Sequence, residues 1–409
     1  MNAYTLAVVA LLCFGWVLDW IVERLNVRHA SPELPPEFAD VYDAARYARS
    51  QQYLRETTRF GLVRSTIMLA ATLLFLLAGG FGWLHGVAVA VASSSIVQGL
   101  VFAGAGLLIA LLAGLPFDLY RTFVIEERFG FNRTTLRTFA LDRIKGLTLS
   151  VLIGAPLFAL ILWLFESIAS AWLWAWIATN LFQTGIAFVA PVVILPLFNK
   201  FTPLENGELR TRLSEYAQSQ NYRLGGVFKI DGSRRSTKTN AYFTGFGKTK
   251  RIALFDTLLE RHTTDELVAV LAHETGHAKL GHVGKHIAMG WIASLPMFAG
   301  LAFFLPRTGL YEGFGVEGTP IYVGFALFGF LYTPVSLLLG IAGNVMSRRH
   351  EYDADAFAAR TTGQPAALAV ALKKLSSHNL GNLTPHPLKV FLEYSHPPVL
   401  DRIRALNPE

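Results

Sequence analysis

The sequence is poor in cysteine and in charge, and both shortages narrow the possible functions. Its one cysteine, Cys13, lies in an apolar stretch, so the chain can form no internal disulfide and no cysteine-based zinc cluster. Charged residues make up only 16% of the 409, against about 25% in soluble domains. The net charge of +7 comes with no nucleic-acid-binding module, so we expect no nucleic-acid partner. With 52% hydrophobic residues and a mean hydropathy of +0.39, the composition is that of an integral membrane protein.

Several apolar runs are long enough to cross a bilayer, which takes about 20 mostly apolar residues. The seven stretches predicted to be membrane spans are 4–22, 62–84, 96–117, 146–165, 168–198, 286–305 and 321–345. The fifth contains Pro191 and Pro196, which predicts a kink or a tilted, extended helix. The first is unlike a cleaved signal peptide, because it has no basic segment ahead of its apolar core and no clear cleavage site.

Lysine and arginine are concentrated in alternate connections between the predicted spans. The segments 23–60 and 118–145 hold six each, whereas the connection 85–95 holds none. Basic connections stay preferentially in the cytoplasm. We therefore expect the N-terminus outside the cell and the C-terminus in the cytoplasm, together with the two longest polar regions.

These considerations predict a mainly α-helical, polytopic membrane protein with a small cytoplasmic α/β insert, whose chemistry the motifs below identify. The insert is expected to contain two strands around a turn at 245–247, followed by a helix that begins near Thr263 or Thr264. The predicted division of the chain is spans one to five in 1–198, the α/β insert in 199–285, spans six and seven in 286–345, and a helical C-terminal region in 346–409.

The strongest motif is His273-Glu274-Thr275-Gly276-His277, an H-E-x-x-H pattern on the predicted helix. Residues four apart share a helical face, so both imidazoles can reach one metal ion while Glu274 lies beside it to handle a proton. Two further histidines, His282 and His286, lie about 180° and 220° around a continuous helix from His273. We expect both to point away from the ion unless the helix ends first, and we assign them structural roles.

A third ligand is expected just after the seventh span, where Glu351 and Asp355 are four residues apart. One carboxylate can complete a His-His-Glu zinc site, with Glu351 favoured, while the other accepts a ring N–H from a zinc-bound histidine. Three protein ligands leave a position for water, whose pKa zinc lowers to about 7. With Glu274 as proton acceptor, this constellation predicts a zinc metalloendopeptidase.

Separated blocks of sequence carry a family resemblance. They read LAHETGHAKLGH, SRRHEYDAD, TNAYFTGFGKTKRIALFDTLL and EYSHPPVLDRI, with further similarity in PFDLYRTFVIEERFGFN and PLFNKFTPL. Together they resemble the type I CAAX prenyl proteases, and the similarity extends over most of the chain.

The resemblance implies a membrane zinc endopeptidase whose seven helices enclose a large water-filled chamber, with the site facing inward. The site residues that it implies are His273, His277 and Glu351 as zinc ligands, Glu274 as catalytic base, Asp355 as hydrogen-bonding partner of a ligand, His396 as transition-state stabiliser, Arg402 close to that histidine, and Asn240 with the adjacent Ala241 as contacts to the substrate backbone.

Three alternatives remain open at this point. A heat-shock (HtpX-like) quality-control protease has fewer spans. A site-2 protease has its H-E-x-x-H within a span, whereas Asp265 and Lys279 bracket the motif here. A transporter or receptor with a structural zinc site has no need of Glu274. The expected partners are the bilayer and a peptide or protein substrate, with or without a prenyl group. The abundance of arginine and alanine favours a bacterial cytoplasmic membrane, where CAAX prenylation is generally absent, over the endoplasmic reticulum of a eukaryote.

Overall fold

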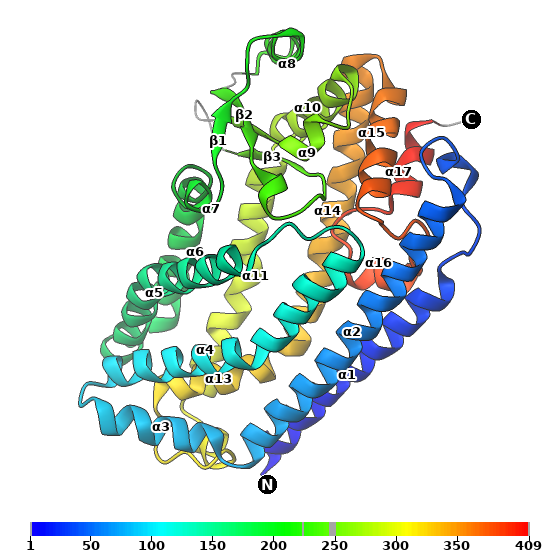
Figure 1. Ribbon diagram of the computed structural model, residues 1–409. Helices are drawn as coiled ribbons and strands as arrows, with labels where there is room; N and C mark the ends of the chain where they lie inside the picture. Colours follow the sequence, from blue (N-terminus) through cyan, green and yellow to red (C-terminus); the bar gives the residue numbers. More distant parts are fainter. Residues whose placement is uncertain (1, 223–224, 245–250, 408–409) are drawn as a thin grey trace.

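The computed structural model describes residues 2–222, 225–244 and 251–407, and in these ranges the chain is mainly helical (Figure 1). Its longer helices are α1 (Ala3–His29), α2 (Ala44–Leu77), α3 (Gly80–Val91), α4 (Ser95–Tyr120), α5 (Leu136–Ser167), α6 (Ala171–Val189), α8 (Glu208–Ser219), α10 (Thr264–Lys279), α11 (His282–Phe304), α13 (Ile321–Leu331), α14 (Thr333–Thr362) and α15 (Pro365–His378). The shorter ones are α7 (Leu195–Phe198), α9 (Asp256–Leu259), α12 (Thr308–Glu312), α16 (Pro387–Glu393) and α17 (Val399–Leu406), with single turns η1 (Pro36–Phe38), η2 (Arg121–Glu126), η3 (Ala190–Ile194) and η4 (Gly232–Arg234).

All seven predicted apolar stretches fall in helices, but two of them are each broken into two separate helices. Six helical segments of the described chain are long and apolar enough to cross a membrane, and a seventh candidate is the pair α13 and α14, which meet at an angle of 59°. Pro334 in the first turn of α14 has no N–H to continue the ladder from α13. The predicted span 62–84 is likewise interrupted, because Gly79 has a φ of 75° and α3 starts a new helix after it.

The predicted irregularity in the fifth stretch takes a specific form. The backbone becomes π-helical over η3 (Ala190–Ile194), which contains Pro191. Proline cannot donate the backbone hydrogen bond that an α-helix requires there, and a wider turn accommodates the loss.

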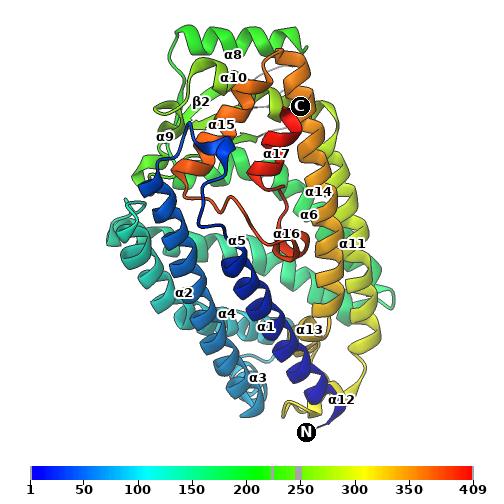
Figure 2. The same ribbon diagram turned by 90° about the vertical axis from the view of Figure 1, so that its right-hand side faces the viewer.

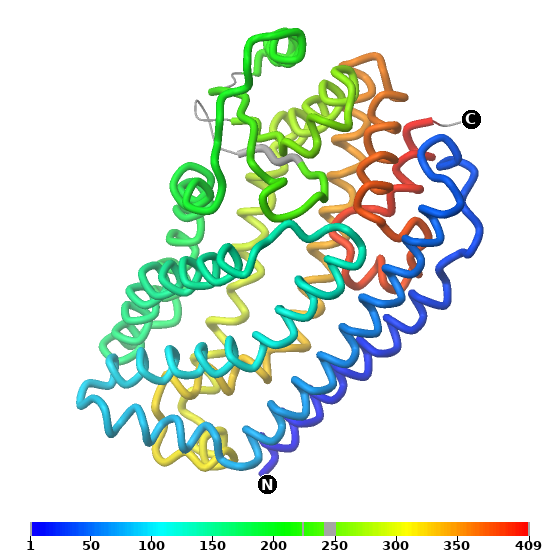
Figure 3. The backbone as a smooth tube through the Cα atoms, in the orientation of Figure 1, coloured from blue at the N-terminus to red at the C-terminus, as the bar shows by residue number. Residues whose placement is uncertain are grey.

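The apolar helices pack pairwise into a closed ring. From α1 to α6, each helix packs against the one that follows it in the sequence. Helix α6 then packs against α11, and α11 packs against α14. Helix α16 contacts both α14 and α1 and so closes the ring, which Figure 3 shows as the red and blue parts of the chain meeting. Helix α13 contacts α1, α4, α5 and α11 and crosses the ring near one end (Figures 1 and 2). An apolar cavity of about 670 Å³ lies beside α13, lined by residues of α2, α4 and α5 as well.

A layer of mixed structure covers the opposite end of the ring from α3 and the N-terminus (Figure 2). Its strands are β1 (Phe201–Pro203), β2 (Gly226–Ile230), β3 (Ala241–Thr244) and β4 (Arg251–Phe255). They form one sheet in the order β1-β2-β4-β3, in which β2 and β4 are parallel and the other pairs antiparallel. The two strands predicted around 245–247 are therefore β3 and β4, while the turn itself lies outside the described residues.

Helix α10 is the centre of this layer. It begins with a capping box between Thr263 and Glu266, in agreement with the predicted start. Residues 266–273 are all buried, as expected for a helix that is covered on every side. Its neighbours are α8, α14 and α15, and the surrounding core also includes Phe38 near the start of the chain and Ile403 near its end. Residues 199–285 thus share one core with distant segments, and the predicted division into four domains remains a prediction.

Candidate active site

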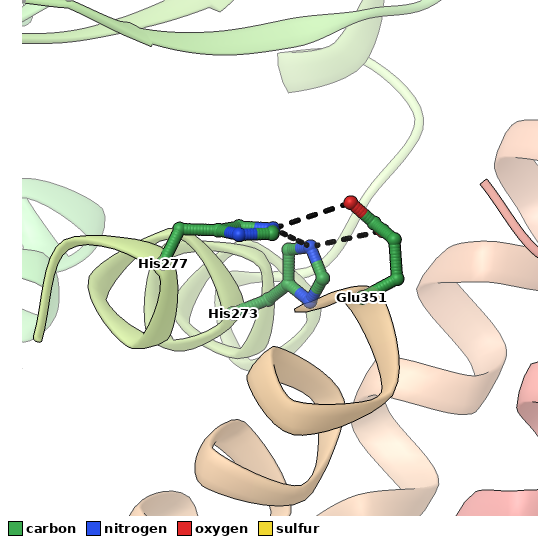
Figure 4. A group of neighbouring side chains, drawn as sticks. All are labelled: His273, His277 and Glu351. Carbon is green, nitrogen blue, oxygen red and sulfur yellow. Dashed lines mark hydrogen bonds and ion pairs between the residues drawn. The ribbon is translucent and has the colours of Figure 1, made fainter. Parts of the chain in front are cut away.

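Two imidazoles and one carboxylate converge where α10 packs against α14 (Figure 4). His273 Nε2 lies 3.1 Å from His277 Nε2 and 3.5 Å from Glu351 Oε2. His277 Nε2 lies 3.3 Å from Glu351 Oε1. One nitrogen or oxygen of each residue lies within 4.8 Å of the others, so the three side chains can share a metal ion.

The close approach of α10 and α14 depends on a glycine within the motif. A Cβ atom at Gly276 would lie 3.1 Å from the Cα atom of Ala354, 3.2 Å from its carbonyl oxygen and 3.2 Å from Cβ of Phe357. These separations are tight for a carbon atom. Glycine at this position lets α14 approach α10 closely enough for Glu351 to reach the two histidines.

His273 is held from behind by a buried ion pair. Its Nδ1 lies 2.8 Å from Asp355 Oδ1, and Arg402 donates to both oxygens of Asp355 at 2.7 Å. Arg402 Nη1 also lies 3.1 Å from Glu351 Oε2. With Asp355 as acceptor, the proton of His273 is on Nδ1, and Nε2 presents its lone pair to the cluster.

The Nδ1 atom of His277 also has a partner, which is a second imidazole where His273 has a carboxylate. His277 Nδ1 lies 2.9 Å from Nδ1 of His282, a buried residue whose ring stacks on that of His350 at 3.9 Å. His350 Nδ1 in turn lies 3.2 Å from His286 Nε2. His282 was expected to point away from the site unless the helix ended first, and the helix does end first. Helix α10 ends at Lys279, and the chain turns through Gly281, whose φ is 70°, before α11 begins.

The cluster suits a tetrahedral metal ion. When Asp355 and His282 accept the Nδ1 protons, both Nε2 lone pairs and the carboxylate of Glu351 face one another, and a cation relieves that repulsion. Zinc ligands at about 2.0–2.1 Å in a tetrahedron are separated from one another by about 3.3 Å. The three separations observed are 3.1, 3.3 and 3.5 Å. Two imidazoles with one carboxylate are also a common donor set of catalytic zinc.

Two groups of the motif have shifted pKa values. Burial raises the pKa of Glu274, and the nearby negative charge of Glu351 adds to the shift. Burial by itself lowers the pKa of His277, but the hydrogen bond with Glu351 and its negative charge outweigh burial and raise the value. Glu274 is therefore a better proton acceptor than an ordinary surface glutamate, and protons compete for His277 with any ion.

His396 lies at the rim of the cluster. Its Nε2 is 3.3 Å from Glu351 Oε1, its Nδ1 is 2.9 Å from Ser395 Oγ, and its side chain is 66% exposed. It is much more exposed than Glu351, whose side chain is 7% exposed. The structure thus brings His396 to the cluster, with one face open to an approaching molecule.

Asn240 lies directly before β3, the outermost strand on its side of the sheet, and Ala241 is the first residue of that strand. The backbone carbonyl of Asn240 accepts a hydrogen bond from the backbone N–H of Phe255 at 3.3 Å. The side chain of Asn379, a residue that the sequence did not single out, accepts from the N–H of Thr239 at 3.0 Å and donates to its carbonyl at 3.1 Å. Asn379 therefore fixes the backbone that leads into this edge strand.

Comparison with known proteins places these features in a wider group. Residues 23–200 match the family model "CAAX prenyl protease N-terminal, five membrane helices", and residues 203–409 match "Peptidase family M48". The CAAX prenyl protease 1 homolog of Oryza sativa subsp. japonica is 36% identical over 97% of this chain and 96% of its own length. The CAAX prenyl protease 1 of Saccharomyces cerevisiae is 35% identical over 95% of this chain and 92% of its own length. The crystal structure of S. mikatae Ste24p superimposes with a TM-score of 0.95 at 32% identity, and the match covers 100% of both chains.

Proposed function

The chain belongs to peptidase family M48, in the group of membrane-embedded CAAX prenyl proteases, and from this premise we propose that zinc is its metal and that His273, His277 and Glu351 hold it. Membership makes the protein a metalloendopeptidase and favours that function over a transporter or receptor and over the HtpX-like type. The observation that supports the ligand set most directly is the triangle of 3.1, 3.3 and 3.5 Å between the three donor groups.

The chemistry is divided between the metal and the motif glutamate. When bound, zinc supplies an acidified water and polarises the scissile carbonyl. Glu274 accepts a proton on its carboxylate and returns it to the departing amine, for which a raised pKa is suitable. Asp355 and His282 accept the outer N–H groups of His273 and His277 and so keep each Nε2 directed at the ion.

The substrate is proposed to bind as an extended strand. The outer edge of β3, which begins at Ala241 directly after Asn240, offers main-chain hydrogen bonds to an extended substrate. Such bonds make little demand on the sequence of the substrate. His396, exposed beside the cluster, donates to the oxyanion that develops during attack. Arg402 holds Asp355 and Glu351 in place from the buried side.

The relatives are named for prenylated CAAX sequences, and we propose that this enzyme also acts on peptides or unfolded chains, with preference for a prenylated C-terminal motif. The distribution of basic residues supports an N-terminus outside and a C-terminus in the cytoplasm. The layer of mixed structure around α10, which we call the catalytic layer, lies at the opposite end of the helical ring from the N-terminus (Figure 2). This arrangement is consistent with that orientation. The composition supports a bacterial cytoplasmic membrane, where CAAX prenylation is generally absent, so the preference for a prenyl group is proposed as a trait of the binding site and peptides or unfolded chains as the natural substrates.

The decisive experiment replaces the proposed base in the purified protein. Glu274→Gln keeps the shape of the side chain but removes its ability to take a proton, so peptide hydrolysis should fall roughly a hundredfold or more while zinc content stays at one ion per chain. Glu260→Gln makes the same change at an exposed position of the same layer and should leave the rate unaltered. Hydrolysis by Glu274→Gln at the wild-type rate would falsify the assignment.

The preference for lipid is tested with one peptide in two forms. We expect a farnesylated CAAX peptide to be cleaved faster than the same peptide without farnesyl, in the same detergent and at the same enzyme concentration. Equal rates would instead indicate general peptide clearance, while leaving the roles of the zinc ligands intact.

A further inference from the structure

A second cavity, distant in sequence from the zinc cluster, lies between α2 and the end of α4. Its volume is about 810 Å³, and none of the proposed site residues lines it. The lining residues that matter for its chemistry are Arg55, Arg59 and Val63 of α2, Phe117 and Tyr120 of α4, and Arg128 after η2. The cavity thus joins arginines to aromatic and aliphatic side chains.

The two arginines of α2 that line this cavity share one side of the helix with exposed apolar residues. Met68 and Phe75 of α2 line the apolar cavity beside α13, which residues of α3, α4 and α5 also line. At 100° per residue, Met68 lies about 180° around the helix from Arg59, and Phe75 about 200° from Arg55. The arginines lie instead on the side of α2 that carries exposed apolar residues, because Val63 and Leu74 are about 40° and 60° from Arg59 around the helix, as expected of a surface that faces lipid.

Arg55 and Arg59 are exposed and, among the described residues, neither forms an ion pair or side-chain hydrogen bond. Other arginines nearby are neutralised: Arg128 pairs with Glu56, and Arg143 with Asp118 at 2.7 Å. Four residues apart on one helix, the two free guanidinium groups are neighbours. Each planar guanidinium group can donate two parallel hydrogen bonds, an arrangement that suits phosphate oxygens.

The level of the cavity along α2 matches that of a lipid headgroup. The polar first half of α2 ends near Arg64, which pairs with Asp118 at 3.6 Å, and a mostly apolar stretch from Ile67 to Leu77 follows. Tyr120 stacks on Phe60 at 5.4 Å with an interplanar angle of 19°, so an aromatic wall stands at this border. Aromatic residues and arginines are both typical of the interface between membrane and water.

We propose that this cavity is a binding site for an anionic phospholipid. Arg55 and Arg59 bind the phosphate group, and the upper part of an acyl chain packs against Val63 and Phe117. Two positive charges without a protein partner favour a headgroup with a net negative charge. A zwitterionic headgroup would also bring a cationic group, and the carboxylate of Glu56 in the cavity lining is already paired with Arg128. The apolar half of the cavity favours a lipid over free phosphate.

The test measures lipid affinity in the full-length protein, independently of peptide hydrolysis. Native mass spectrometry of the detergent-solubilised protein is used to titrate phosphatidylglycerol and phosphatidylcholine. Wild type should bind phosphatidylglycerol in preference, and the double variant Arg55→Gln, Arg59→Gln should weaken that binding roughly 20-fold without altering the binding of phosphatidylcholine. Arg55→Lys with Arg59→Lys should retain part of the preference.

The matched control is Arg133→Gln with Arg137→Gln, which removes the same two charges, also four residues apart, from exposed positions outside the cavity. It should bind phosphatidylglycerol as wild type does. Unchanged affinity of the Arg55, Arg59 variant, or an equal loss in the control, contradicts the site. Competition by glycerol phosphate at the concentration at which phosphatidylglycerol binds would show a soluble-phosphate site and overturn the lipid assignment. Zinc content and melting temperature verify that each variant is folded.

Discussion

The two histidines of the motif differ in what holds their outer nitrogens. His273 has the carboxylate of Asp355, itself fixed by Arg402, whereas His277 has the imidazole of His282. Partners of this kind fix the tautomer and orientation of a ligand, and their loss typically costs about 10–100-fold in metal affinity. Both partners are buried, so neither is easily replaced by water.

The role of His282 can be measured through metal affinity. His282→Phe fills the space but removes the acceptor, so zinc affinity in competition with a chelator should fall at least about tenfold. His282→Asn, whose amide oxygen can accept from His277, should recover part of the affinity. His286→Phe is the control, because His286 contacts His350 and not a proposed ligand. Affinity of His282→Phe equal to that of wild type would show that the contact does not position the ligand.

The pH dependence of zinc binding follows from His277. Its pKa in the metal-free protein is raised above the ordinary value of 6.5. Protonation of His277 therefore begins at a higher pH than for an ordinary histidine, and it competes with zinc. Zinc content after equilibration with a chelator should decline as the pH falls through and below neutrality. Full occupancy and full activity at pH 4 would contradict the assignment of the ligands.

The sequence indicated most of this site but not all of it. Spacing alone paired His273 with His277 and Glu351 with Asp355, because residues four apart share a helical face. The same rule directs His282 away from the site, but it holds only while the helix continues. The signal that could have corrected it is Gly281, since glycine with positive φ is a common helix end.

Among the elements, the pair α10 and α14 determines whether the cluster exists, because each supplies part of it. Their contact passes through Gly276, where an added Cβ would meet Ala354 at 3.1 Å and Phe357 at 3.2 Å. The distance between these helices therefore depends on the absence of a side chain at Gly276.

Substitution of this glycine should weaken the site without touching a proposed ligand. Gly276→Ala forces α10 and α14 apart by a few tenths of an ångström, which should cost about 1–3 kcal/mol of stability and lower zinc affinity. Thermal unfolding and chelator competition measure the two effects. Gly284→Ala in α11 adds a methyl group with nothing within 4 Å and should change neither. Equal behaviour of the two variants would show that helix spacing is not limiting.

Hydropathy located the apolar helices but not their breaks. Apolar residues flank Leu77 in the run 62–84 and Leu331 in the run 321–345, yet a helix ends at each of these positions. Gly79 and Pro334 mark the breaks, and single glycines and prolines also occur within apolar helices, as Pro156 does in α5. Only packing against the rest of the ring decides which of them interrupts a helix.

In the whole molecule, the catalytic layer is assembled from three parts of the chain. Leu267 and Leu271 of α10 share a core with Phe38, with Leu368 of α15 and with Ile403 of α17. No sequence pattern shows such sharing, because apolar residues at helical spacing do not specify their partners. For this reason the predicted boundaries at 199 and 285 do not delimit a separate core.

A fragment comprising residues 199–285 should therefore not fold alone. It contains the motif histidines but lacks Glu351 and the apolar residues that cover α10. Circular dichroism of the purified fragment should show little helix, and zinc should bind at least a hundredfold more weakly than to the whole protein. Co-expression of the fragment with the remaining segments tests whether noncovalent assembly restores both properties.

The order of the site residues along the chain has a consequence for biosynthesis. Arg402 lies 129 residues after His273, and α16, which joins α14 to α1, lies between Asp355 and Arg402. A nascent polypeptide emerging from the ribosome exposes the two histidines long before it can supply Glu351, Asp355 or Arg402. With the site residues proposed above, unfinished chains should consequently lack hydrolytic activity until translation has supplied α17.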